Sequence, residues 1–327
     1  MQNGIHVEHL SKHFKVHERE AGMGGAWRSL FRRQFRTVTA VDEISFHIEP
    51  GEIVGFLGPN GAGKTTTMKM LSGLLHPTSG ELLVGGYKPF QQKAAFKKRI
   101  TLVMGQKSQL IWDIPAMETF LVNQAIYEIP DAQFKETVGE LIDLLELEPL
   151  LKKPVRNLSL GERMKCELAA SLLHRPEIIF LDEPTIGLDV NMQETVRRFI
   201  KAYNERFNAT VLLTSHYMAD VTALCKRVII INHGKILFDG DLAALVQNLA
   251  PYKVAKLTLS APVEREHLQT YGEILHVEYP EVSVKLPRAD VSGASAKILA
   301  ELPVQDFTVE DPPMEDVIGL AFAGESA

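Results

Sequence analysis

The pattern of hydrophobic and polar residues changes once along the chain, near residue 240. Before that point, short apolar runs such as 177–182 ("EIIFLD") and 210–214 ("TVLLT") alternate with longer segments of helical periodicity. The longest such segment is 115–175, which has breaks near its prolines. Because strands that alternate with helices favour a mainly parallel sheet covered on both faces, residues 1–240 predict an α/β domain.

The pattern of residues 241–327 predicts a small α+β domain instead. The expected order is strand, helix, two strands, helix and strand, followed by a last helix from residue 313. Alternation of apolar residues over 272–279 and again over 281–287 gives each of these two strands one apolar face. A β-α-β-β-α-β order matches the ferredoxin-like pattern. The region contains no convergent set of histidines, cysteines or carboxylates that indicates catalysis.

Composition narrows the classes of function. The length of 327 residues fits about two domains. The formal charge of -6 argues against a protein that binds nucleic acid through bulk charge. Cys166 and Cys225 lie far apart without a CxxC spacing, so we expect reduced thiols in the core and no zinc site. The N-terminus is too polar for a signal peptide, and no apolar run approaches the roughly 20 residues of a membrane span.

The stretch "GPNGAGKT" carries the clearest chemistry. It follows the apolar run "IVGFL" and precedes a helical segment, which is the context in which G-x-x-x-x-G-K-[ST] binds the phosphates of a nucleotide. Backbone N–H groups of such a loop form an anion nest, Lys64 can reach the β- and γ-phosphates, and Thr65 can hold Mg²⁺. The predicted binding residues are Gly58, Pro59, Asn60, Gly61, Ala62, Gly63, Lys64, Thr65 and Thr66.

Two carboxylates follow the apolar strand "IIFLDEP". Asp182 and Glu183 stand at its carboxyl end, which is the edge of a parallel sheet where ligands bind. Asp182 is expected to contact Mg²⁺ through water. Glu183 is the expected general base for the water that attacks the γ-phosphate, so the pair predicts hydrolysis of a nucleoside triphosphate.

With these motifs in place, the chain resembles the ATP-binding subunits of ABC transporters over residues 1 to about 240. The most specific stretch is "LSLGERMKCELAASLLHRPEIIFLDEPTIGLD" at 158–189, where the signature, the catalytic strand and the D-loop stand in the family's order. The resemblance implies a P-loop ATPase fold. Its parts would be a RecA-like core, an antiparallel β subdomain and a helical subdomain at about 106–165.

The resemblance also implies roles for residues outside the two motifs. Gln106 matches the Q-loop glutamine that contacts Mg²⁺ and the water, although Gln109 three residues later is a rival for this position. Asp189 matches the D-loop aspartate, and His216 matches the switch histidine that binds the γ-phosphate. Phe14 stands where the family places the aromatic ring that stacks on adenine.

The signature departs from the family's usual LSGGQ, because Leu160 replaces its first glycine and Glu162 its glutamine. Ser159 and Glu162 also form the sequence pattern of a capping box. In the family, the signature acts on the nucleotide of the opposite subunit. Ser159, Gly161 and Glu162 are therefore predicted nucleotide contacts across a homodimer, where the Glu162 carboxylate would raise the electrostatic cost of closure.

What the resemblance implies for function is an ATPase subunit that powers an exporter. The signature and the appended small domain resemble ATPases paired with ABC-2 type permeases, so we expect a homodimer on the cytoplasmic face of the cell membrane. The segment "VMGQKSQLIWDIP" would line the groove for a helix of the permease, or else pack in the core. The C-terminal domain would serve dimerisation or regulation. A soluble ABC ATPase acting in translation or DNA repair is the alternative, and the cargo is left open between glycans and amphiphilic drugs.

One segment is not explained by these motifs. Residues 17–37 are expected to be an insertion between the first two strands, and "WRSLFRRQFR" at 27–36 has the pattern of a basic amphipathic helix. Its arginines take one side and its aromatic residues the other. Such a helix would contact an anionic membrane surface or the permease, or would pack on its own domain.

Overall fold

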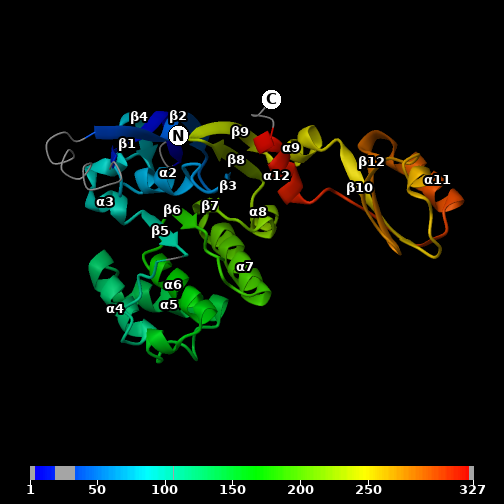
Figure 1. Cartoon of the computed structure of the whole chain (residues 1–327). Coiled ribbons are helices and arrows are strands. Elements are labelled where there is room, and N and C mark those ends of the chain that lie inside the picture. Colours follow the sequence, from blue (N-terminus) through cyan, green and yellow to red (C-terminus); the bar gives the residue numbers. More distant parts are fainter. Residues whose placement is uncertain (1–3, 19–33, 106, 324–327) are drawn as a thin grey trace, which may run out of the picture. The chain divides into compact units, whose positions relative to one another are not determined.

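A computed structural model describes residues 4–18, 34–105 and 107–323 of the chain. The chain forms two compact units, Met1–Gly240 and Asp241–Ala327 (Figure 1).

The first unit is built around a sheet in the strand order β5-β6-β7-β3-β8-β9. Adjacent pairs from β5 to β8 run parallel, as the alternation of strands and helices predicts. The inner strands are short and buried, and β6 and β7 have no exposed residue. The strands of this sheet are β3 (Ile53–Leu57), β5 (Ile100–Met104), β6 (Ile178–Asp182), β7 (Thr210–Thr214), β8 (Arg227–Asn232) and β9 (Lys235–Asp241).

Helices follow most of these strands, and three longer ones form the predicted helical subdomain: α4, α5 and α6 (Figure 1). None of the helices in the described ranges has both the length and the apolar character that crossing a membrane requires. The helices of the first unit are α2 (Lys64–Leu71), α3 (Ala94–Lys97), α4 (Ala116–Tyr127), α5 (Asp131–Leu145), α6 (Leu160–Leu172), α7 (Val190–Phe207) and α8 (Met218–Leu224).

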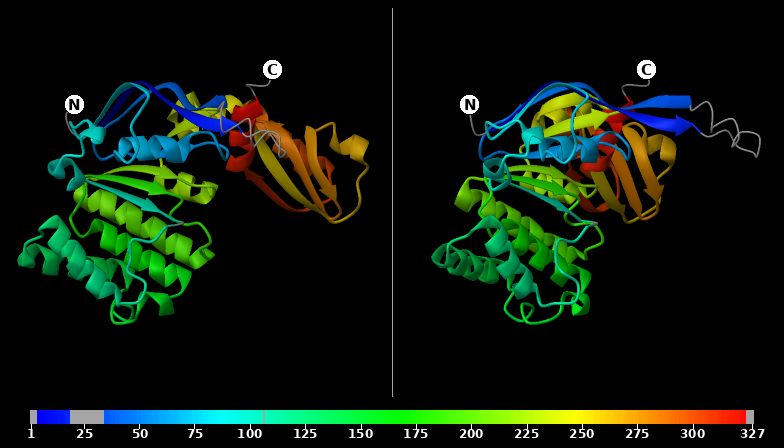
Figure 2. Two further views of the ribbon diagram at one scale, coloured as in Figure 1. Left: turned by 60° about the vertical axis from the view of Figure 1, so that its left-hand side comes forward. Right: turned by 90° about the vertical axis from the view of Figure 1, so that its left-hand side faces the viewer.

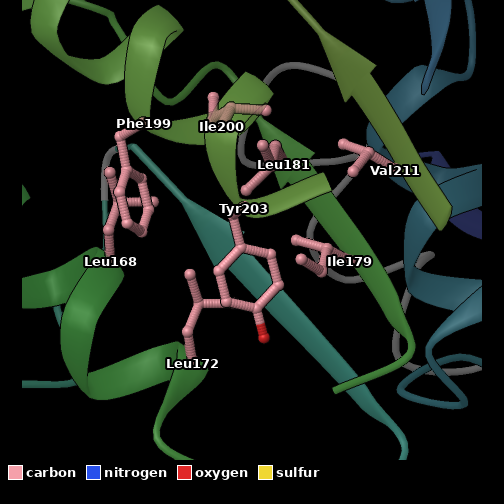
Figure 3. A pocket seen from close by; sticks show the side chains of 8 residues that line it. All are labelled: Leu168, Leu172, Ile179, Leu181, Phe199, Ile200, Tyr203 and Val211. Atoms are coloured by element: carbon pink, nitrogen blue, oxygen red, sulfur yellow. The ribbon is translucent and has the colours of Figure 1, made fainter. Parts of the chain in front are cut away.

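Two apolar layers enclose the parallel sheet. One joins α2 and the inner strands to a second sheet, and its buried side chains include Met68 of α2, Phe56 of β3 and Phe180 of β6. The other layer contains side chains of α6, α7 and the strands β6 and β7 (Figure 3). A gap of about 10 Å³ lies among these side chains of the second layer and is bordered by Tyr203. The core is therefore closely packed there and leaves no room for a substrate.

The second sheet of this unit is antiparallel, in the order β2-β1-β4, as the family resemblance implies. Its strands are β1 (Ile5–Glu18), β2 (Gln34–Ile48) and β4 (Ser79–Val84). β4 pairs only with the first part of β1, from Ile5 to Ser11. Beyond that point β1 and β2 continue together as a two-stranded ribbon, whose register runs on to Glu18 opposite Gln34 (Figure 2).

This ribbon corrects the prediction of a helix over 27–36. Gln34, Phe35 and Arg36 are strand residues, so the helix is wrong for this part, while residues 27–33 lie outside the described ranges. The physical reason is in the sequence that follows, because "RTVTAV" is rich in β-branched residues that favour a strand. The other end of the expected insertion, His17 and Glu18, likewise belongs to β1.

The second unit confirms the ferredoxin-like prediction. Its four-stranded sheet has the order β11-β12-β10-β13 with antiparallel neighbours. Side chains of one sheet face, such as Val284 and Leu286 of β12, pack with Ile298 of α11 and form a core of their own. The elements are α9 (Leu242–Leu249), β10 (Tyr252–Leu259), α10 (Arg265–Leu268), β11 (Glu273–Glu278), β12 (Glu281–Pro287), α11 (Val291–Glu301), β13 (Val304–Glu310) and α12 (Met314–Ala323).

Candidate functional site

The predicted phosphate loop runs from the end of β3 to the first residue of α2. Gly61 and Gly63 have φ values of 82° and 111°, which few residues other than glycine adopt. A Cβ at Gly63 would also strike the carbonyl oxygen of Ala40, and one at Gly58 would collide with the carbonyl oxygen of Ile231. The loop therefore lies close against two neighbouring strands, and only glycine fits at these points.

The rest of the loop differs in exposure from residue to residue. Pro59 and Asn60 are exposed, whereas Ala62 is buried and its carbonyl accepts a hydrogen bond of 3.0 Å from the N–H of Gly234. Thr65 and Thr66 are half-buried in the first turn of α2. The outer part of the loop thus remains open to a ligand while its inner part is fixed to β8 and β9.

Lys64 turns back onto this loop. Its side chain is buried and donates hydrogen bonds to the carbonyl oxygens of Gly58 at 2.6 Å and Pro59 at 3.0 Å. Burial lowers the pKa of the Lys64 ammonium group, and the nearby carboxylates of Glu183 and Asp182 oppose that shift. Desolvation strengthens the attraction of this cation for an anionic ligand, whereas the two neighbouring carboxylates oppose that attraction.

Asp182 connects the phosphate loop to two strands. It ends β6, is buried, and accepts a hydrogen bond of 2.9 Å from Thr65 Oγ1 and one of 2.7 Å from Thr214 Oγ1. Thr214 ends β7. The structure thus places an ionisable carboxyl and a hydroxyl side by side at the carboxyl edge of the sheet, where oxygen ligands suit Mg²⁺.

Glu183 and His216 meet next to this carboxylate. Glu183 Oε1 lies 2.9 Å from His216 Nε2, and the N–H of Glu183 is 3.1 Å from both the carbonyl oxygen and Oγ1 of Thr214. The φ of Glu183 is 56°, in the left-handed region that costs a residue with a Cβ roughly 1 kcal/mol or more. The loop after β6 therefore holds Glu183 in a strained conformation that turns its carboxylate toward His216.

A buried polar cluster that the sequence analysis missed supports these two residues. Asp220 of α8 accepts hydrogen bonds from Thr185 Oγ1 at 2.5 Å, Ser215 Oγ at 2.6 Å and Arg197 Nη1 at 2.9 Å. Thr185 follows Glu183 by two residues, and Ser215 directly precedes His216. Asp220 is 1% exposed, so this carboxylate fixes both loops from inside. In the sequence, the only sign of this buried role is a charged residue among the mostly apolar neighbours of "MADVTAL".

The structure describes only the residues on either side of the predicted Q-loop glutamine. Gln106 lies outside the described residues. Its rival, Gln109, donates from Nε2 to the carbonyl oxygen of Leu102 at 3.1 Å, and its N–H donates to Glu167 Oε1 at 2.7 Å. Ser108 Oγ is 2.9 Å from the other oxygen of the same carboxylate. The segment after Gln106 is therefore attached to α6, the helix that begins at the signature, through a buried glutamate that the sequence analysis did not identify.

The signature opens α6 with the predicted capping box. Ser159 Oγ accepts from the N–H of Glu162 at 3.2 Å, and Glu162 Oε2 accepts from the N–H of Ser159 at 2.8 Å. The bond from the Ser159 N–H is the main cause of a lowered pKa of the Glu162 carboxyl. A Cβ on Gly161 would strike Met192 of α7, so the signature packs directly on the helix that follows the D-loop.

Asp189 lies at the start of α7, and Phe14 lies in β1. Asp189 caps α7, because its Oδ1 accepts a hydrogen bond of 2.9 Å from the N–H of Met192. Phe14 lies in the ribbon opposite Val38, is 36% exposed, and has Lys12 Nζ 5.2 Å from its ring centroid. Among the described residues, no hydrogen bond joins the signature residues 159–162 to the phosphate loop 58–65.

Comparison with known proteins decides the family. Residues 41–186 match the model of the ABC transporter family. The ATP-binding protein NatA of Bacillus subtilis is 35% identical over 218 residues, which cover 67% of this chain and 88% of NatA. The linearmycin resistance ATP-binding protein LnrL of the same organism is 32% identical over 263 residues, covering 80% and 84% of the two chains.

The chain is a member of the ABC transporter ATP-binding proteins. As an ABC ATPase, it shares 33% identity over 234 residues with the Nod factor export ATP-binding protein I of Burkholderia thailandensis, covering 71% of this chain and 76% of that one. Residues 251–310 match the model of the EvrA-like ABC transporter C-terminal domain.

Solved structures agree on the fold. The ATP-binding subunit of an ABC transporter superposes with a TM-score of 0.62 at 21% identity, covering 75% of this chain and 93% of that one. A dimeric ATP-binding cassette in a post-hydrolysis state, bound to ADP and Pi, gives a TM-score of 0.60 at 23% identity and covers 73% and 98%.

The contact between Gly105 and Glu183 leads to a first prediction. A Cβ at Gly105 would collide with the carbonyl oxygen of Glu183 and come within 2.9 Å of Ile186 Cγ2. Because Glu183 is already strained, Gly105→Ala should displace its carboxylate and lower kcat for ATP about 10-fold or more, with little change in KM. Steady-state ATPase kinetics measure both constants.

The matched control is Gly139→Ala in α5, where an added Cβ meets nothing within 4 Å. It should keep the kcat of the wild type. An unchanged kcat in Gly105→Ala would show that the carbonyl contact does not position Glu183.

Proposed function

We propose that this ABC ATPase is the ATP-hydrolysing subunit of an ABC-2 type exporter, working as a homodimer on the cytoplasmic face of the cell membrane. The observation that carries the proposal is the convergence of Lys64, Thr65, Asp182, Glu183 and His216 at one edge of the sheet. The relatives with export or resistance in their names support a transport role over one in translation or DNA repair.

ATP would bind on the phosphate loop, with Lys64 moving from its own backbone carbonyls to the β- and γ-phosphates. Residues 60 and 61 leave the outer side of the loop open, and nothing lies within 4 Å of the position that a Cβ on Gly61 would take. Phe14, on the ribbon next to the loop, supplies a half-exposed ring on which adenine can stack. The contact between the ribbon and the loop is made through Ala40, two residues from the strand partner of Phe14.

The residues at the sheet edge also fit Mg²⁺, which would neutralise charge on the phosphates when bound. Thr65 Oγ1 and Asp182 Oδ2 lie 2.9 Å apart and are both hard oxygen ligands. We assign Thr65 to hold the ion directly and Asp182 to hold it through water, with Gln106 as a further ligand.

Glu183 would act as the general base. It accepts a proton from the water whose oxygen attacks the γ-phosphorus, while the bond between that phosphorus and the ADP oxygen breaks. His216, 2.9 Å from Glu183 Oε1, keeps the carboxylate oriented in the structure described here. On binding ATP, His216 would contact the γ-phosphate, and Asp220 would hold its loop in place through Ser215.

A second copy would complete the site. The signature residues Ser159 and Glu162 form the cap of α6, and residues 159–162 make no hydrogen bond to the phosphate loop 58–65 of the same chain. This supports use of the signature by the opposite subunit. Ser159, Gly161 and Glu162 would then contact the partner's nucleotide, and Asp189 would lie at the junction. Two sites that close around ATP and reopen after hydrolysis provide the stroke that drives export.

The permease would dock at the groove next to the Q-loop. This groove of about 400 Å³ is lined by residues of the Q-loop, the signature helix and the D-loop, among them Ser108, Arg163 and Gly187. Ile111 and Trp112, from the segment predicted to contact the permease, lie outside the lining of this groove and are exposed at 44% and 51%. The basic segment 27–36 remains a second proposed contact with the membrane surface or the permease, although its last residues form a strand.

The role of Glu183 gives the second prediction. Glu183→Gln removes the proton acceptor but keeps the shape, so turnover should fall by about 10²-fold or more while ATP still binds. Multiple-turnover ATPase assays and a filter assay for retained ATP measure the two effects. Hydrolysis near the wild-type rate would rule out Glu183 as the base.

The unusual signature gives the third prediction. Glutamine also completes a capping box, so Glu162→Gln should preserve α6 while removing a negative charge from the proposed interface. Dimerisation driven by ATP should be unchanged or tighter in sedimentation experiments. A clear loss of the dimer would contradict the electrostatic argument, and Ser159→Ala, which removes the cap itself, serves as the destabilised comparison.

A further inference from the structure

Strand β11 is an edge of the sheet in the C-terminal unit. The sheet order places β12 on one side of it, and the described residues place no strand on the other. An edge strand directs alternate N–H and C=O groups away from its sheet, where they can pair with another strand.

Alternate side chains of β11 and its following turn are apolar and exposed. Leu275, Val277 and Tyr279 are 46%, 40% and 50% exposed. The opposite edge, β13, differs. Its apolar residues Val304, Phe307 and Val309 pack on the core of the unit, and the residues between them are polar. The exposed apolar surface is thus confined to one of the two edges.

The residues of β11 are complementary to themselves. If two copies lie side by side and antiparallel with Val277 opposite Val277, residues 276–278 of the two copies form the regular part of the ladder. Leu275, at the register irregularity of β11, and Tyr279, in the turn after the strand, then flank this ladder on the two copies. In the same arrangement, His276 of each copy lies opposite Glu278 of the other copy. Within one copy these two side chains lie on the same face of the strand, with His276 Nε2 3.7 Å from Glu278 Oε2.

The same register also improves the electrostatics of the hairpin. Glu278 lies opposite Glu281 of β12, and like charges in that position repel. A His276 from a second copy would lie beside Glu278 and present a ring N–H to its carboxylate. A register centred on His276 would keep Leu275 opposite Val277. It would also place Ile274 opposite Glu278 and the Glu273 carboxylate opposite Tyr279, which pairs apolar with charged side chains.

We propose that β11 pairs with β11 of a second copy of this chain, centred on Val277, and joins the two C-terminal sheets into one. The inference deepens the proposed homodimer, on which it rests, by assigning a contact that needs no nucleotide. Two ATPase domains tethered in this way would meet at a raised effective concentration, so closure around ATP becomes an intramolecular step.

The first test uses the full chain without nucleotide. The wild type should sediment as a dimer at micromolar concentration, and Val277→Lys should weaken the association about 10-fold or more because a charge is placed on the twofold axis. The matched control is Gln305→Lys, an exposed position on the opposite edge, which should behave as the wild type. A monomeric wild type, or a Val277→Lys variant that associates as tightly as the wild type, would overturn the proposal.

A charge exchange tests the register and is independent of any loss of stability in Val277→Lys. His276→Glu should weaken the dimer because it opposes Glu278 with a second carboxylate. The double variant His276→Glu with Glu278→His exchanges the two partners and should restore it. Failure of the double variant to recover the dimer would contradict the register.

ATP-driven closure is measured separately, in Glu183→Gln with and without Val277→Lys at high protein concentration. Closure should persist in both, but need more protein when β11 is altered. If nucleotide-free pairing stands while ATP adds no further closure, the proposed ATPase dimer fails and the β11 interface does not. If ATP closes the dimer but the nucleotide-free protein is monomeric, the interface fails alone.

Discussion

The carboxylate of Asp182 is the point on which the ATPase unit depends. It ends a fully buried strand and receives hydroxyl hydrogen bonds from Thr65 on one side and Thr214 on the other. Those bonds join the first turn of α2 to the ends of β6 and β7, which are far apart in the sequence. Breaking the hydrogen bonds of a buried carboxylate is costly. The phosphate loop and the ends of β6 and β7 are therefore fixed in one arrangement.

The chemistry follows from what this arrangement imposes on its neighbours. Glu183 directly follows Asp182 and takes a left-handed conformation that brings its carboxylate to His216. Gly105 leaves room for the carbonyl group of Glu183, and Asp220 holds the loops on both sides of the pair. The Q-loop segment is in turn attached to the signature helix through Glu167. One short segment thus carries Gly105, against the carbonyl group of Glu183, and Ser108 and Gln109, which bind α6.

What could be predicted from the sequence was local. The phosphate loop, the acidic pair after β6 and the capping box at Ser159 are each encoded by a few adjacent residues, and the ferredoxin-like order could be recognised from strand alternation. The ribbon was predicted wrongly at Gln34, Phe35 and Arg36, because helical spacing of arginines was weighed without the strand partner that lies about 20 residues earlier. Asp220, Arg197 and Glu167 were missed for the same reason, since their roles arise from contacts between distant segments.

The most direct test of this account measures how Mg²⁺ changes the affinity for ATP. Titration calorimetry would compare the wild type with Asp182→Asn, which keeps a side chain of the same shape. The account predicts that Mg²⁺ tightens the binding of ATP strongly in the wild type and much less in Asp182→Asn, because the variant has lost one of the groups assigned to the ion. Equal tightening by Mg²⁺ in both proteins would contradict the place given to Asp182 at the centre of the site.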